Sequence, residues 1–209
     1  MKKAFTLAEI LITLSIIGVV AALTIPTLIQ RTGDEEIVSK LSKAYSTLSQ
    51  ASEMIMTEQG SPKVWNTDVD SLYNAYKSHL RNAKECGSTS GCLSAGKYRF
   101  LKSSGYDDNW DNSNIMRKLI LSDGTQIAFG RYLTPDCTGS NHGSKNICAD
   151  ILVDLNGSKA PNIIGRDLFA FVLKETGLYP AGCDVDECST AQYGYGCACR
   201  VLQEGKIDY

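Results

Sequence analysis

The chain has 209 residues, with 21 Lys and Arg against 23 Asp and Glu, so its formal net charge at pH 7 is −2. Binding to nucleic acid depends on Lys and Arg side chains that neutralise phosphates. No basic cluster of that kind occurs along the sequence, which disfavours nucleic acid as a partner.

The N-terminal stretch is the most hydrophobic part of the chain. Lys2 and Lys3 precede an apolar run, and no residue from position 10 to position 30 carries a charge. At about 1.5 Å per residue this run makes a helix of about 30 Å, the thickness of a bilayer core. A cleavable secretory signal, a plain membrane anchor and a buried core helix are the alternatives. The run is longer than the apolar stretch of a secretory signal, and Glu9 interrupts its start. A plain anchor leaves Glu9 and Pro26 without an explanation. A core helix would be apolar along one stripe, whereas this run is apolar all round.

Residues 2–9 read Lys-Lys-Ala-Phe-Thr-Leu-Ala-Glu. This N-terminus resembles that of type IV prepilins and of the pseudopilins of type II secretion. The resemblance implies a leader, residues 1–4, which a prepilin peptidase cuts between Ala4 and Phe5 before the new amine is methylated. Glu9 and Pro26 would then occupy mature positions where the family usually has glutamate and proline. Ala4 stands where the family usually has glycine, so we expect slower processing.

The acidic side chain of Glu9 needs a reason to lie beside hydrocarbon, where a carboxylate costs about 2.5–3.5 kcal/mol on insertion scales. Our hypothesis is that Glu9 of one subunit pairs with the cationic amine of Phe5 on a neighbouring subunit inside a filament. Burying the two charges together avoids the costly arrangement in which one is buried alone. The alternative is a glutamate at the headgroup boundary with no partner.

The resemblance predicts a structural protein and not an enzyme: a subunit of a type IV pilus or of the pseudopilus of type II secretion. Its partners would be copies of itself or related pilin-like subunits, and the processing peptidase. The protein would first cross the bacterial inner membrane once, with an exported head, and then enter a periplasmic or extracellular filament. The alternative is a membrane-anchored exported binding module that does not polymerise.

The expected organisation is a leader (1–4), a transmembrane or filament-core helix (5–30), its amphipathic continuation (31–59) and a globular exported head (60–209). From residue 37 to residue 55, apolar residues recur at steps of three and four, which predicts one buried helix face. Gly60 and Pro62 end that helix. Gly18 and Pro26 predict either a bend or, as the resemblance implies, a stretch that unwinds in the filament.

A second, shorter helix is predicted at 68–81. Strands are then predicted at 98–101, 115–121, 126–133, 147–155 and 168–173. Asp123 and Gly124 stand between two of these strands and suit a tight hairpin turn. A long helix followed by such strands predicts an α+β fold, in which the N-terminal helix packs on an antiparallel β-sheet head with disulfide-stapled loops.

All eight cysteines lie in the predicted head: Cys86, Cys92, Cys137, Cys148, Cys183, Cys188, Cys197 and Cys199. An even number in an exported segment predicts a disulfide framework. Spacing favours one bridge between Cys86 and Cys92 and another between Cys137 and Cys148. Cys197 and Cys199 are too close together to prefer each other, so each is expected to pair with Cys183 or Cys188. The alternative for these last four is a zinc site, although the usual C-x2-C spacing is missing.

The stretch from Asp154 to Asp167 is the candidate for bound chemistry. Asp154 and Asn156, followed by Gly157, place hard oxygen ligands around a turn, and Asp167 could complete a calcium shell. The spacing fails the EF-hand pattern, which needs glycine at the sixth and an acid at the twelfth position. An ordinary Asn-Gly hairpin turn is therefore favoured over calcium. No other cofactor is predicted.

Signatures of catalysis are missing from the sequence. Residues 91–98 nearly form a phosphate-binding loop, but Tyr98 replaces the Ser or Thr that would hold magnesium. His79 and His142 have no carboxylate or cysteine neighbour at catalytic spacing, and we expect both at the surface. The sequence therefore predicts that the protein is not an enzyme.

Overall fold

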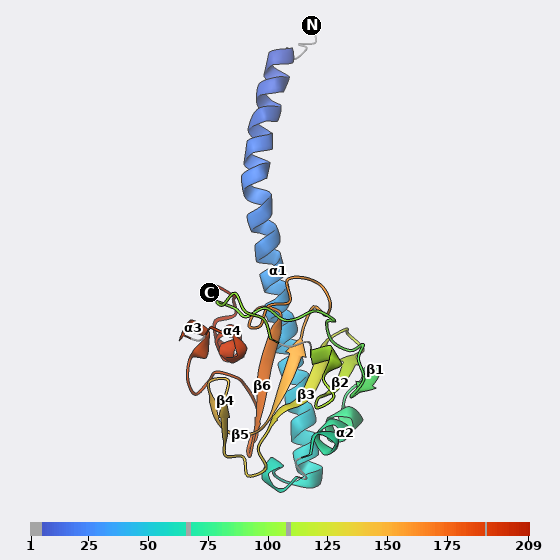
Figure 1. Cartoon of the computed structure of the whole chain (residues 1–209). Coiled ribbons are helices and arrows are strands. Elements are labelled where there is room, and N and C mark those ends of the chain that lie inside the picture. Colours follow the sequence, from blue (N-terminus) through green and yellow to red (C-terminus); the bar gives the residue numbers. More distant parts are fainter. Residues whose placement is uncertain (1–5, 66–67, 108–109, 191) are drawn as a thin grey trace. The chain divides into compact units, whose positions relative to one another are not determined.

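The computed structural model of the chain describes residues 6–65, 68–107, 110–190 and 192–209. Its helices are α1 (Leu7–Gln59), α2 (Val69–His79), α3 (Glu187–Thr190) and α4 (Ala198–Glu204), with short 3-10 turns η1 (Pro62–Val64), η2 (Trp110–Asn112) and η3 (Tyr195–Cys197). Its strands are β1 (Asn82–Gly87), β2 (Arg117–Leu121), β3 (Gln126–Leu133), β4 (Gly139–Asn141), β5 (Ser144–Asp154), β6 (Leu168–Lys174) and β7 (Gly177–Pro180). Figure 1 shows the predicted α+β fold, a long N-terminal helix packed on an antiparallel sheet.

The structure separates into two compact units, one ending at Glu36 and the other running from Ile37 to Tyr209. We call residues 7–36 the N-terminal half of α1 and residues 37–209 the head. The head therefore includes the second half of α1, whose buried stripe consists of Leu41, Ala44, Leu48, Ala51 and Ile55. This is the helix face that the spacing of apolar residues predicts. Gly60 ends the helix with a φ of +79°, a conformation that glycine adopts without strain.

Helix α2 is fixed at its start and along its length by polar contacts. The carboxylate of Asp68 accepts a hydrogen bond of 2.8 Å from the backbone N–H of Ser71, which caps the first turn. Arg117 of β2 forms a forked ion pair with Asp70, with N–O distances of 2.5 and 2.8 Å. Since the partners lie on different elements, the pair fixes α2 against the sheet.

Seven strands form one antiparallel sheet within the described parts of the chain. Its order is β1-β2-β3-β5-β6-β7, and β4 pairs with β5 outside this path. The two predicted strand pairs are confirmed, because β2 pairs with β3 and β5 pairs with β6. The first pair is joined at Asp123 and Gly124, where Gly124 has a φ of +90°.

Both faces of the sheet are buried. One face packs against α2 and the second half of α1, in a cluster that includes Leu48, Phe129 and Phe171. Residues of the opposite face join a second cluster with side chains from loops, among them Tyr98 and Trp110. Two-sided burial explains why β5 and β6 read as nearly continuous apolar runs without polar alternation.

The strand predicted at 98–101 is wrong. Arg99 makes isolated bridges to Tyr106 and Ile163, but no continuous ladder forms there. Conversely, β1, β4 and β7 were not predicted. β1 lies at the edge of the sheet and exposes Lys84 and Glu85, so it lacks the apolar alternation that marks a strand in sequence.

Candidate functional site

Apolar side chains cover the N-terminal half of α1 on all sides. Leu14, Ile17 and Leu23 are 61%, 62% and 70% exposed. Among the helices that the structure describes, α1 alone is long and apolar enough to cross a membrane. The hydroxyl groups of Thr13, Ser15, Thr24 and Thr32 donate to carbonyls of the helix backbone, as Ser15 does to that of Leu11 at 2.8 Å. The stretch therefore leaves these side chains satisfied without water, as a hydrocarbon environment requires.

Glu9 has a local partner that the sequence reasoning overlooked. Its Oε2 atom accepts hydrogen bonds from the backbone N–H of Thr6 (2.8 Å) and from the Thr6 hydroxyl (2.9 Å). The Thr6 hydroxyl in turn accepts from the backbone N–H of Glu9 at 3.2 Å. This is a capping box, and its Thr-x-x-Glu signature is visible in the sequence. Ala4 and Phe5, the predicted processing residues, lie outside the described residues.

Pro26 lies inside α1, and the helix runs through both it and Gly18 without interruption. Proline removes one backbone hydrogen bond at this point, the one that would reach the carbonyl of Ala22. Despite this loss, the helix of the single chain is continuous at Pro26. Unwinding in a filament stays a prediction.

The eight cysteines form four disulfides in the head, which is the framework that their even number predicts. The bridges are Cys86–Cys92, Cys137–Cys148, Cys183–Cys199 and Cys188–Cys197. Cys197 and Cys199 thus pair back to the two earlier cysteines, as their spacing indicates. Because all four of these sulfurs are in disulfides, they do not form the alternative zinc site. An apolar N-terminal helix together with several disulfides is the signature of an exported or membrane-anchored protein.

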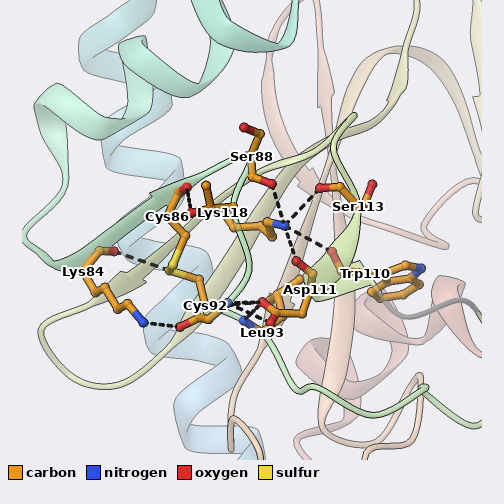
Figure 2. Close-up of a disulfide and its surroundings, with 11 residues drawn as sticks. Lys84, Cys86, Ser88, Cys92, Leu93, Trp110, Asp111, Ser113 and Lys118 are labelled. Carbon is orange, nitrogen blue, oxygen red and sulfur yellow. Dashed lines mark hydrogen bonds between the residues drawn. A yellow bond between two sulfur atoms is a disulfide. The ribbon is translucent and has the colours of Figure 1, made fainter.

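The Cys86–Cys92 bridge adjoins a buried polar cluster that no sequence motif predicts (Figure 2). The carboxylate of Asp111 accepts hydrogen bonds from the backbone N–H groups of Gly91, Cys92 and Leu93, at 2.8 to 3.0 Å. These three amides belong to the segment that resembled a phosphate-binding loop. They bind a carboxylate of the same chain in the place of a phosphate.

Lys118 of β2 completes this cluster (Figure 2). The Lys118 side chain is fully buried, and its Nζ donates to backbone carbonyls, including those of Asp111 (2.5 Å) and Ser113 (3.0 Å). Burial lowers the pKa of the Lys118 ammonium group, and the nearby Asp111 opposes that shift. Together Asp111 and Lys118 fasten the loop between β1 and β2 to the sheet.

The Asp154–Asp167 loop brings the predicted ligands together and uses them internally. Asp154 accepts hydrogen bonds from the N–H groups of Asn156 and Gly157 and from the hydroxyl of Tyr98. Asp167 accepts from the N–H of Ile163 and from the Asn156 side chain. The Asn-Gly pair therefore makes a side-chain-closed turn inside the long β5–β6 connection, and it is not the two-residue hairpin that we expected.

The calcium alternative has support from one feature of this loop. The side-chain oxygens of Asn156 and Asn162 are buried and have no hydrogen-bond partner in the part of the chain that the structure describes. Against calcium, each carboxylate oxygen already accepts a bond from the protein. No group of three or more His, Cys, Asp or Glu side chains is arranged to hold a metal ion among the described residues.

The prediction that both histidines lie at the surface is wrong for His142. Its side chain is 4% exposed, and its Nε2 lies 3.2 Å from Oδ2 of Asp150, a buried carboxylate. His142 and Gly143 both have positive φ angles and form the two-residue turn between β4 and β5, which packs beneath Tyr195. His79 is partly buried, and its Nε2 lies 3.2 Å from Glu58. Both carboxylate neighbours are distant in sequence.

Comparison with known families gives one match. The sequence model of a family of unknown function, DUF6613, matches residues 27–194. This region begins inside α1 and covers most of the head, so the Thr6–Glu9 capping box lies ahead of it. No curated protein matches the chain. No solved structure matches it either.

Proposed function

The chain belongs to this family of unknown function, and we propose that it is a pilin-like structural subunit of a type IV pilus or of the pseudopilus of type II secretion. In this proposal residues 1–4 are removed, the amine of Phe5 is methylated, and the protein waits in the inner membrane with its head exported. Polymerisation with copies of itself or with related subunits then transfers the N-terminal half of α1 from lipid into the filament core. The protein has no catalytic role.

The observation that carries the proposal is the uncovered N-terminal half of α1. None of the apolar window that could span a membrane is buried inside the described structure. Full burial of one Val, Leu, Ile or Phe side chain contributes about 1.5–3 kcal/mol. A bilayer covers such a surface before assembly, and the packed helices of a filament cover it afterwards.

Glu9 supports assembly over simple anchoring. Membrane insertion of a plain anchor is not helped by an acidic residue at the start of its helix, whereas a filament gains a charge that fixes the register of neighbouring subunits. The capping box is the competing explanation, because it gives Glu9 a role inside its own chain. Pairing with an amine needs the negative charge of Glu9, whereas the capping box needs only an acceptor oxygen. Substitutions can therefore separate the two roles.

Two variants of the full chain, expressed in its native cells, test the proposal. Glu9→Gln keeps an oxygen that can accept the capping hydrogen bonds but removes the charge, whereas Thr6→Ala removes the cap and keeps the charge. We expect filaments to be lost in Glu9→Gln and retained in Thr6→Ala, as counted by electron microscopy of sheared material. Membrane levels measured by immunoblotting control for insertion. Normal filaments from Glu9→Gln would refute the pairing of Glu9 with an amine.

The second candidate function is a membrane-anchored exported binding module that does not polymerise. A hollow in the head that is lined by aromatic and polar side chains favours this candidate. In that case neither Glu9→Gln nor Thr6→Ala would change any filament.

A further inference from the structure

A hollow in the head lies where four segments meet: the loop after β1, the end of β3, the β4–β5 turn and the chain around α3 and η3. It has a volume of about 600 Å³, within the range of about 300–1,000 Å³ that small-molecule sites occupy. Among the residues that the structure describes, its lining includes Phe100, Asp107, Arg131, Tyr132, Asn141, His142, Glu187, Tyr193 and Tyr195.

Several contacts hold the Arg131 side chain in the wall of the hollow. The guanidinium carbon of Arg131 lies 5.1 Å from the ring centre of Trp110 and 4.7 Å from that of Tyr195. Its Nη2 lies 2.8 Å from Oδ2 of Asp107, which also accepts a hydrogen bond from the Tyr195 hydroxyl. Charged groups held in this way lose little conformational freedom when a ligand binds.

The charges of the lining are nearly balanced. Arg131 is compensated by Asp107, and His142 lies against the buried carboxylate of Asp150. Among the described lining residues, Glu187 is the remaining charged side chain, and it adds one negative charge. A phosphate or carboxylate would therefore meet a paired guanidinium and a repelling carboxylate, so an anionic ligand is disfavoured.

Aromatic rings supply the apolar part of the hollow. Phe100 and Tyr193 meet edge to face, with ring centres 4.7 Å apart, and Tyr193 is 53% exposed. A ligand cation would need several open ring faces around it. Here the guanidinium of Arg131 already covers the rings of Trp110 and Tyr195.

We propose that this hollow binds a neutral saccharide. A pyranose ring has C–H faces that stack on aromatic rings and hydroxyl edges that both donate and accept hydrogen bonds. Tyr193 and Phe100 offer the stacking surface, the carboxylate of Glu187 offers acceptors, and the side-chain NH2 group of Asn141, whose oxygen accepts from the His142 N–H, offers donors. A single sugar at such a site binds with a Kd of about 1 mM.

The experiment uses the full chain in lipid nanodiscs prepared without glycolipid or glycosidic detergent. Saturation-transfer NMR is recorded with the methyl glycosides of glucose, galactose and N-acetylglucosamine. We expect at least one of them to bind, and Tyr193→Ala to weaken that binding tenfold or more. Tyr106→Ala is the matched control, because Tyr106 is similarly exposed (59%) and lies outside the lining. Near-UV circular dichroism confirms that both variants stay folded.

A further variant separates a saccharide from a cation. Glu187→Gln is expected to change glycoside binding less than threefold, because glutamine still accepts a hydrogen bond. The proposal is overturned if none of the three glycosides binds, if Tyr193→Ala and Tyr106→Ala behave alike, or if tetramethylammonium binds instead and Glu187→Gln abolishes it. The assay needs no filament, so its result is independent of the assembly proposal.

Discussion

The N-terminal half of α1 and the head are stabilised in opposite ways. In the head, the second half of the same helix buries a stripe of apolar residues, and disulfides and buried polar contacts fasten the loops. In the N-terminal half, apolar side chains such as Leu14 and Leu23 are exposed on every side. One helix thus combines a stretch with a buried apolar stripe and a stretch whose apolar side chains are exposed in the described structure.

This difference indicates where each substitution should act. A change in the head should alter the free energy of unfolding of the head and leave the helical hydrogen bonds of the N-terminal half unchanged. A change in the N-terminal half should alter membrane insertion or assembly and leave the stability of the head unchanged. Four measurements test this difference and the contacts that stabilise the head.

The largest contrast is expected between two leucines of the same helix. Leu48 is fully buried in the head, whereas Leu14 is 61% exposed. Leu48→Ala should destabilise the head by about 2–5 kcal/mol, because it removes apolar contacts and leaves a cavity. Leu14→Ala should change stability by less than about 0.5 kcal/mol. Chemical denaturation of the full chain in nanodiscs measures both, and equal effects would contradict the division into two units.

Asp111→Ala should have the next largest effect. Three backbone N–H groups lose their acceptor, two of them buried, and the fully buried Lys118 loses a neighbouring negative charge. The expected loss of stability is about 2–4 kcal/mol. Asp111→Asn should cost less, since the amide retains one acceptor oxygen. If both variants unfold at the parent's denaturant midpoint, the cluster does not fasten the loop.

The pH dependence of stability tests the buried loop acid. Burial raises the pKa of Asp154 from 3.8 to about 7, opposed by the hydrogen bond from Tyr98 and reinforced by the charge of Asp167. Between these two pH values the folded chain holds a proton that the unfolded chain has released. The Asp154 contribution is therefore complete below about pH 4 and is lost as the pH rises through about 7. In denaturation measured across this range, Asp154→Asn should decline less steeply than the parent.

Calcium provides a control for that interpretation. An ion bound by Asp154 and Asp167 would favour their charged forms, and it would raise the thermal midpoint at neutral pH by mass action. If the internal hydrogen bonds suffice, millimolar calcium leaves the midpoint unchanged, and magnesium gives the same result. A calcium-specific rise that disappears in Asp167→Asn would instead establish the metal site.

The smallest predicted effect is a difference between two disulfides. Cys183–Cys199 closes a loop with a sequence separation of 16, and Cys86–Cys92 closes one of 6. In the loop-entropy account, the longer loop stabilises by about 1 kcal/mol more. Replacing each pair by alanines and comparing denaturant midpoints tests this order. An equal or larger loss from the Cys86–Cys92 pair would show that its contacts with the Asp111 cluster outweigh loop length.

Much of the fold could be predicted because local patterns and tertiary contacts agree. The apolar spacing of the second half of α1 matches its buried stripe, and Asp123-Gly124 forms the expected hairpin turn. Cysteine spacing limited the disulfide pairing to few choices. By contrast, the capping box of Thr6 and Glu9 was not predicted, although its Thr-x-x-Glu pattern is present in the sequence.

The rest could not be predicted because distant residues create it. Lys118 looks like a surface residue, yet carbonyls from a loop surround its ammonium group. His142 is buried because its turn packs under Tyr195, which lies far along the chain. The hollow combines residues from four segments with no motif in common. Each of these environments depends on contacts between segments that sequence periodicity does not report.

The most direct test of the central claim is the identity of the first residue of the mature protein. Mass spectrometry of the protein purified from its native cells should find a chain that begins at Phe5 with a methylated amine. Cells that lack the gene should lose a filament containing it. An intact Met1, or cleavage beyond the apolar run, would contradict the account, because α1 would then be an anchor or a removed signal and not a filament core.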